Sequence, residues 1–168
     1  MHSATDVDYR IAVVGNSSSG KTTISRYLKE KTNLPYHSID AISWNPDGSL
    51  VSEALRREKH QSFSSGAQWI IDGNSNQSLK RATHVIYLKT GRPKCSVRCV
   101  FRAIALKLRL KKDFIPSPIA RLVSNLHFIW GFPKFFGNEL DKMAENDDRF
   151  IVLTQNSDIA QVNDSIGI

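Results

Sequence analysis

The chain has 168 residues, with 23 lysines and arginines against 16 aspartates and glutamates, and a formal net charge of +7. At roughly 100–200 residues per domain, this length favours one domain with its own hydrophobic core. A hydrophobic content of 40% excludes a disordered chain, and two cysteines exclude a disulfide scaffold. The sequence has no run of about 18 apolar residues for a membrane span and no N-terminal pattern of a secretory signal, so we expect a cytoplasmic protein.

Short apolar segments alternate with helical patterns along the chain. The expected strands are Tyr9–Val14, Pro35–Ile39, Trp69–Ile71, His84–Leu88 and Phe150–Leu153. The expected helices are Lys21–Lys31, Leu50–Phe63, Arg98–Lys112 and Ile119–Trp130, the last of them ended by Gly131-Phe132-Pro133. Strands separated by helices of this length are typical of βαβ units. The sequence therefore predicts an α/β fold with a five-stranded, mostly parallel sheet buried on both faces.

Positive charge is concentrated in one quarter of the chain. Between Gly73 and Lys112 there are 11 basic residues and no acidic one, which leaves 12 basic residues against all 16 acidic residues elsewhere. A local basic region attracts polyanions, either nucleic acid or the phosphates of a nucleotide. The expected helix within this region also carries an apolar stripe, made of Val97, Val100, Phe101, Ile104 and Leu108.

One motif points to phosphate binding. Gly15-Asn16-Ser17-Ser18-Ser19-Gly20-Lys21-Thr22 fits the pattern G-x-x-x-x-G-K-[ST], directly after an expected strand and at the start of an expected helix. Its glycines allow a tight turn whose N–H groups can point at a phosphate, and the helix N-terminus adds partial positive charge. Lys21 would reach the β- and γ-phosphates of ATP, and the Thr22 hydroxyl would bind Mg²⁺. These eight residues and Thr23 form the predicted ATP site.

With this motif the chain resembles the P-loop kinases of the adenylate kinase and shikimate kinase type. Among them it most resembles the small adenylate-kinase-like "DNA topology modulation" proteins. The resemblance extends from about residue 9 to 157, and it is carried by Arg10–Val14 with the loop, Leu34–Asp40 with Trp44, Trp69–Asn74, Val85–Leu88, Arg98 and Arg102. It implies a P-loop NTPase fold, a three-layer α/β/α sandwich. In that fold residues 1–168 would form one domain, with a basic helical lid at about 90–148.

Two carboxylates follow expected strands at the sheet edge where ligands bind in open α/β sheets. Asp40 comes after the second strand and Asp72 after the third. The resemblance implies that Asp40 binds the phosphoryl acceptor and could act as a base, and that Asp72 supports Mg²⁺. The alternative for each is a helix cap or a turn residue.

The resemblance also implies a pair of arginines that clamp the donor phosphates. Arg98 and Arg102 are four residues apart and would share one helical face, and Arg92 is a third candidate. A planar guanidinium binds phosphate with two donors, which suits this role. The alternative is a solvated basic face.

The remaining candidates are supported more weakly. The resemblance implies that Trp44 and Asn74 line an acceptor pocket, and that Thr154-Gln155-Asn156-Ser157 surrounds the adenine. His37 is a lone histidine at a strand end and favours a structural role. Cys95 and Cys99 have no partners at metal-ligand spacing and should pack. An aromatic group could form a membrane or partner surface or, as we favour, a core: Phe128, Trp130, Phe132, Phe135 and Phe136.

Two functions follow from this reading. The first is an ATP-dependent kinase that transfers the γ-phosphoryl group of Mg-ATP to a nucleotide, a nucleoside or another small metabolite, with Lys21, Asp40, Arg98 and Arg102 in catalytic roles. The second is a nucleotide-dependent regulatory or nucleic-acid-binding module that uses the basic stretch 80–112. Aromatic residues at base-stacking spacing are missing from that stretch, which favours the kinase.

Overall fold

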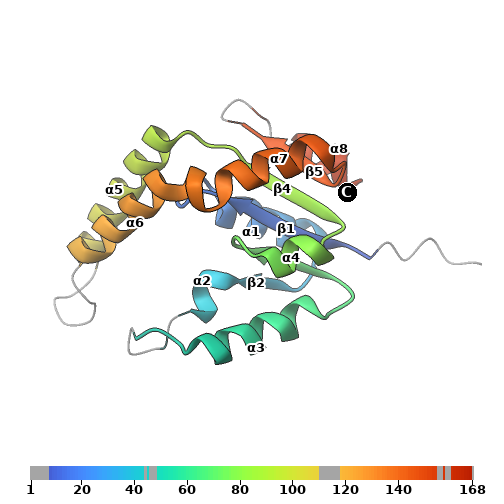
Figure 1. Cartoon of the computed structure of the whole chain (residues 1–168), viewed down its shortest axis with the longest axis horizontal. Coiled ribbons are helices and arrows are strands. Elements are labelled where there is room, and N and C mark those ends of the chain that lie inside the picture. Colours follow the sequence, from blue (N-terminus) through green and yellow to red (C-terminus); the bar gives the residue numbers. More distant parts are fainter. Residues whose placement is uncertain are drawn as a thin grey trace, which may run out of the picture.

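A computed structural model describes residues 8–43, 45, 49–109, 118–154, 157 and 160–167. Five parallel strands pair in the order β2-β3-β1-β4-β5 (Figure 1). Their bounds are β1 Arg10–Gly15, β2 Tyr36–Ser38, β3 Trp69–Asp72, β4 His84–Leu88 and β5 Phe150–Leu153. The prediction of an α/β fold with a five-stranded parallel sheet is therefore confirmed.

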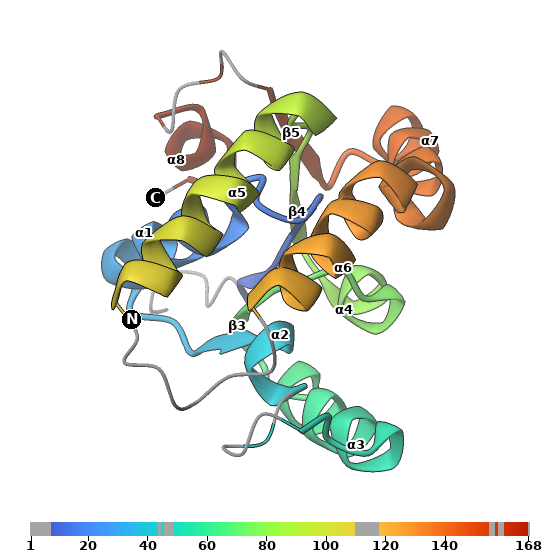
Figure 2. The same ribbon diagram turned by 90° about the vertical axis from the view of Figure 1, so that its left-hand side faces the viewer.

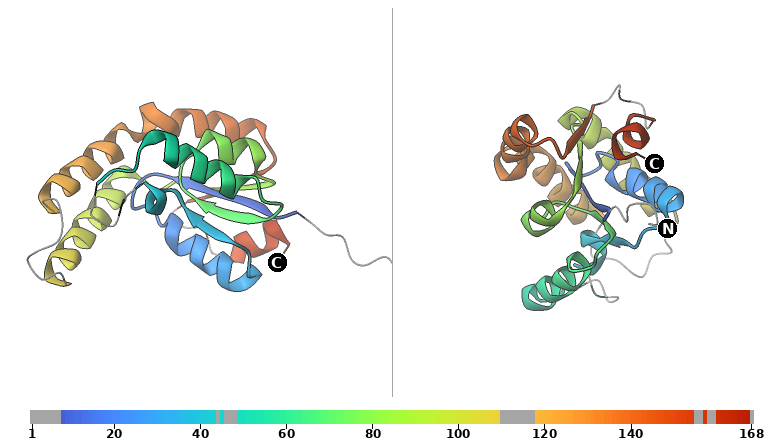
Figure 3. Two further views of the ribbon diagram at one scale, coloured as in Figure 1. Left: turned by 90° about the horizontal axis from the view of Figure 1, so that it is seen from below. Right: turned by 90° about the vertical axis from the view of Figure 1, so that its right-hand side faces the viewer.

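Helices cover both faces of the sheet, which gives the three predicted layers (Figure 3). One face packs against α1 (Lys21–Thr32) and α8 (Ala160–Ile166), and the other packs against α3 (Glu53–Ser64), α4 (Asn76–Arg81) and α7 (Asn138–Asn146). Along β1 the side chains alternate between the two layers. Ile11 and Val13 lie in the core on the α1 side, whereas Ala12 and Val14 lie in the core on the α4 side.

Two further helices, α5 (Arg92–Arg109) and α6 (Pro118–Phe132), lie side by side and extend past the carboxyl ends of the strands (Figures 1 and 2). We call this pair the helical hairpin. Buried Cys95, Cys99 and Ile129 hold it together, so the prediction that the cysteines pack is confirmed. Helix α5 begins six residues earlier than expected. Pro93 is compatible with this early start because a first-turn N–H has no partner within its own helix.

The α-helix α6 ends at Phe132, within the stretch Gly131-Phe132-Pro133 that was predicted to end it, but the chain does not turn away there. The chain continues through a π-helical turn, η1 (Pro133–Gly137), into α7. In this turn the Asn138 N–H donates to the Pro133 carbonyl, five residues earlier. The wider turn accommodates a proline that cannot donate to the preceding turn.

The cluster of five aromatic residues divides between core and surface. Phe132 is buried, and Phe128 and Phe136 pack against the same core. Trp130 and Phe135 are exposed. Most of this cluster is therefore core, as favoured. None of the helices in the described part of the chain is long and apolar enough to cross a membrane.

Candidate functional site

The P-loop, residues 15–22, connects β1 to α1 at the carboxyl edge of the sheet. Gly15 has a φ of +145°, and a Cβ there would lie 2.7 Å from the Leu88 carbonyl oxygen. Gly20 has a φ of +112°. Residues with a side chain rarely adopt these conformations, so both glycines of the motif are required by the shape of the loop.

Asn74 binds the backbone at the start of this loop. Its Oδ1 accepts the Gly15 N–H and its Nδ2 donates to the Gly15 carbonyl, both at 2.9 Å. The resemblance to P-loop kinases implied a place for Asn74 in an acceptor pocket. The structure instead shows both ends of its carboxamide bound to Gly15, so its side chain holds the P-loop.

A second asparagine joins the loop to the helical hairpin. The Asn16 Nδ2 donates to the Ile129 carbonyl on α6 at 3.0 Å, and its Oδ1 accepts the Ser17 N–H at 2.7 Å. Asn16 is buried. The motif allows any residue at this position, so the pattern carried no signal for this contact.

Lys21 lies within the loop. Its Nζ donates to the carbonyls of Gly15 at 3.2 Å and Asn16 at 2.8 Å. Burial lowers the pKa of Lys21, and the nearby carboxylates of Asp72 and Asp40 oppose this effect. The Lys21 amino group therefore lies within the electrostatic reach of two acidic side chains.

Thr22 and Asp72, the two predicted metal ligands, are in direct contact. The Thr22 Oγ1 donates to the Asp72 Oδ2 at 2.7 Å. Asp72 is only 4% exposed. Burial raises the pKa of Asp72, while the hydrogen bond from Thr22 and the charge of Lys21 act in the opposite direction. A hydroxyl and a carboxylate oxygen from two elements thus meet next to Lys21.

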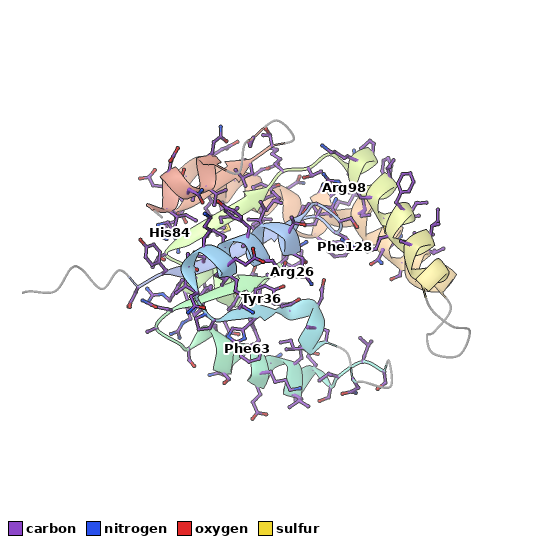
Figure 4. The ribbon with its side chains drawn as sticks, turned by 180° about the vertical axis from the view of Figure 1, so that it is seen from behind. Arg26, Tyr36, Phe63, His84, Arg98 and Phe128 are labelled. Carbon is purple, nitrogen blue, oxygen red and sulfur yellow. The ribbon has the colours of Figure 1, made fainter. Side chains whose placement is uncertain are left out.

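Tyr36 is a second hydrogen-bond partner of this carboxylate, and it was not among the predicted site residues. Its hydroxyl donates to the same Asp72 Oδ2 at 3.3 Å. Burial raises the pKa of Tyr36, and the charge of Asp72 adds to the effect. In Figure 4, Tyr36 lies on the β2 side of α1 and Arg98 lies on the opposite side. Only the pairing of β2 with β3 brings Tyr36 to Asp72.

Asp40 lies in the first turn of a short helix, α2 (Ile39–Ile42), and its side chain is exposed. The expected strand ends at Ser38, because the Ser38 Oγ caps α2 by accepting the Ala41 N–H. Gly73, with a φ of +139°, allows α2 to approach β3, since a Cβ there would lie 2.8 Å from the Ile39 Cβ. Asp40 is close enough for its charge to influence both Lys21 and Asp72.

Arg98 contacts the P-loop from α5. Its Nη1 donates to the Ser19 carbonyl at 3.0 Å, and the Thr90 hydroxyl donates to the same oxygen at 3.3 Å. Arg102, one turn further along α5, is exposed, and its charge contributes to lowering the pKa of Lys21. The third candidate, Arg92, lies over the ring of Trp130, 4.8 Å from its centre, and so packs on the hairpin.

Other candidates fall elsewhere. His37 stacks on Phe63 with ring centres 4.0 Å apart, and burial lowers its pKa, in keeping with the structural role favoured for it. Trp44, Gln155 and Asn156 lie outside the described residues.

A cavity of about 700 Å³ is lined by residues such as His84 and Phe150, at the starts of β4 and β5. It is at the opposite edge of the sheet from the P-loop.

No protein-family model matches the chain, and no curated protein matches it significantly. Among solved structures, it is similar to a gluconokinase from Sinorhizobium meliloti 1021, with 13% identity, a TM-score of 0.49, and coverage of 94% of this chain and 89% of that one. It is also similar to an unliganded sugar kinase from Janibacter sp. HTCC2649, with 17% identity, a TM-score of 0.48, and coverage of 93% and 90%. These likenesses concern the overall fold. The finer resemblance to the "DNA topology modulation" proteins stays a prediction.

Proposed function

We propose that the protein is an ATP-dependent phosphotransferase that moves the γ-phosphoryl group of Mg-ATP to a small acceptor. The observation that carries the proposal is the 2.7 Å contact between the Thr22 hydroxyl and the buried Asp72 carboxylate, directly beside a P-loop lysine. In P-loop enzymes a Thr or Ser of the loop and an aspartate on a nearby strand hold the metal that bridges the β- and γ-phosphates.

The residues at this site fit Mg-ATP. Mg²⁺ prefers oxygen ligands and usually uses one or two carboxylates together with phosphates and waters. Thr22 and Asp72 offer one hydroxyl and one carboxylate. In addition, the Ser19 Oγ is buried in the loop without a hydrogen-bond partner among the described residues. A phosphate in the loop would satisfy that hydroxyl.

The chain's own groups divide into three tasks. The loop N–H groups and Lys21 bind the phosphates, for which Lys21 would exchange its hydrogen bonds to the Gly15 and Asn16 carbonyls. Arg98 and Arg102 neutralise charge that develops on the transferred group. Asp40, exposed on α2, orients the acceptor hydroxyl. Phosphoryl transfer depends mainly on such positioning and charge neutralisation.

ADP release from Mg-ATP, measured across nucleosides, nucleoside monophosphates, sugars and small hydroxy acids, tests the proposal. We expect one acceptor class to support turnover, and Lys21→Ala to lower it by about 10²-fold or more with an unchanged melting temperature. Lys29→Ala, at an exposed lysine near the other end of α1, is the matched control and should keep full activity.

Wild-type turnover by Lys21→Ala would contradict the mechanism. Tight ATP binding without turnover for any acceptor would contradict the kinase itself. That second result would favour the nucleotide-dependent binding module.

A further inference from the structure

The apolar stripe of α5 does not face the hairpin partner. Val97, Val100, Phe101 and Ile104 are 55%, 37%, 68% and 49% exposed. Their spacing of three and four residues places them on one side of the helix. Instead, the buried residues Cys95 and Cys99 pack against α6. A continuous apolar face therefore lies on the solvent side of α5, and we call its four exposed residues the outer stripe.

All charged residues of α5 are positive. The helix contains Arg92, Lys94, Arg98, Arg102, Lys107 and Arg109 and no aspartate or glutamate. Lys94 precedes Val97 by three positions and so borders the outer stripe, whereas the Arg98 side chain reaches the P-loop, where it donates to the Ser19 carbonyl. Figure 2 shows α5 in front of the sheet, at the surface of the molecule. The outer stripe is thus an apolar face within a positively charged helix.

We infer that the outer stripe docks on an anionic lipid membrane, with α5 lying in the plane of the interface. A helix with basic residues on its flanks and Phe, Ile and Val on one face binds such surfaces by burying the apolar face among the headgroups. Anionic lipids attract the net positive charge of the helix, and the long side chain of Lys94 can extend back to the headgroups. The inference does not depend on the proposed kinase activity.

Two other partners fit these observations less well. Nucleic acid would use the positive charges, but it offers little to four exposed aliphatic and aromatic side chains in the middle of the surface. A second copy of the chain would place two helices of six positive charges each against one another, and like charges repel. A negatively charged surface with an apolar interior complements both properties of α5.

Flotation of the full chain with lipid vesicles tests this inference. We expect binding to vesicles of phosphatidylcholine with phosphatidylglycerol, weakened by salt, and little binding to phosphatidylcholine alone. The double variant Phe101→Ser/Ile104→Ser should bind the anionic vesicles about tenfold more weakly or worse, because it removes apolar surface without changing charge. The control Leu50→Ser/Val123→Ser alters residues that are 66% and 60% exposed outside α5, and it should bind like wild type.

Several results would overturn the inference. These are equal binding to neutral vesicles, equal binding by the outer-stripe variant, or a dimer in sedimentation that this variant dissociates. Binding to duplex DNA that is tighter than vesicle binding and unaffected by the variant would assign the surface to nucleic acid. Circular dichroism checks that both variants fold. ADP release measured without vesicles should be equal for both, which separates this inference from the proposed function.

Discussion

The side-chain Nδ2 of Asn16 donates a hydrogen bond, 3.0 Å long, to the main-chain carbonyl of Ile129, which is 113 residues further along the chain. In a continuous α-helix that carbonyl would accept the N–H of residue 133. Residue 133 is a proline and has no N–H. Asn16 therefore satisfies a buried acceptor that Pro133 leaves open, and the P-loop and the π-helical turn are joined at this point.

We expect Asn16→Ala to lower the free energy of unfolding by about 1–3 kcal/mol, because it leaves the Ile129 carbonyl buried without its partner. The loss should be smaller in a Pro133→Ala background, where the new N–H can bind that carbonyl. Urea denaturation of the four proteins gives the coupling energy, which we expect to be about 1 kcal/mol. Equal losses in the two backgrounds would contradict the link between these residues.

Asp72→Asn should stabilise the protein while removing its Mg²⁺ dependence. A buried carboxylate is costly, whereas an amide oxygen can still accept the hydrogen bonds from Thr22 and Tyr36. We expect a gain of about 1 kcal/mol in thermal unfolding without ligand at neutral pH. If the proposed function is right, the variant should also lose the Mg²⁺-dependent increase in ATP affinity.

Asp141→Asn is the control for this variant. Asp141 forms an ion pair with Lys89 at 2.9 Å and accepts a hydrogen bond from Tyr87, away from the P-loop. The Asp141→Asn variant should show the same Mg²⁺-dependent ATP binding as the wild-type protein. An Asp72→Asn variant that still binds Mg-ATP more tightly than ATP would argue against Asp72 as a metal ligand. A destabilised variant would contradict the cost assigned to the buried carboxylate.

The local sequence pattern was sufficient to predict the strands of the sheet and the P-loop. The strands are short apolar runs, and the loop motif is a contiguous eight-residue signal whose glycines are required by backbone conformation. Asp72 could be proposed because the carboxyl ends of parallel strands meet at one edge. These features depend on residues near one another in sequence.

The features that could not be predicted from the sequence are side-chain contacts between residues that lie far apart along the chain. The contacts of Asn16 with Ile129, Asn74 with Gly15 and Tyr36 with Asp72 join residues 113, 59 and 36 positions apart. Amide and phenol groups have many possible partners, so their types carry little information about which one they bind. The short helices α2, α4 and α8 were also missed, because four to seven residues contain too few turns for a periodic signal.

His60 should make the protein less stable in mild acid. Its Nε2 is 2.8 Å from the Ser78 Oγ, and burial lowers its pKa from the ordinary value of 6.5. The unfolded chain therefore takes up a proton at a higher pH than the folded one, and stability falls as the pH drops through 6.5. His60→Gln should reduce this slope in chemical denaturation at a series of pH values.

His127→Gln, at an exposed histidine on α6, is the matched control for replacing a histidine by glutamine in the pH series. Part of the slope should remain in His60→Gln, because burial also lowers the pKa of His37 and His84. Identical slopes for wild type and His60→Gln would show that His60 is not the group responsible.

Arg98→Lys tests whether α5 contributes a phosphate ligand or only positive charge. Lysine keeps the charge but loses the planar donor fork that holds the Ser19 carbonyl and would bind phosphate with two donors. If the proposed function is right, kcat should fall by about 10²-fold, with a smaller change in the KM for ATP. Because Arg98 is exposed, the melting temperature should change little.

Lys94→Ala, one turn earlier on the same helix, is the control. It removes a charge altogether and should retain kcat. If instead Arg98→Lys kept full turnover, or Lys94→Ala lost as much activity, charge on the helix as a whole would be sufficient, and the specific role of Arg98 beside the P-loop would be wrong.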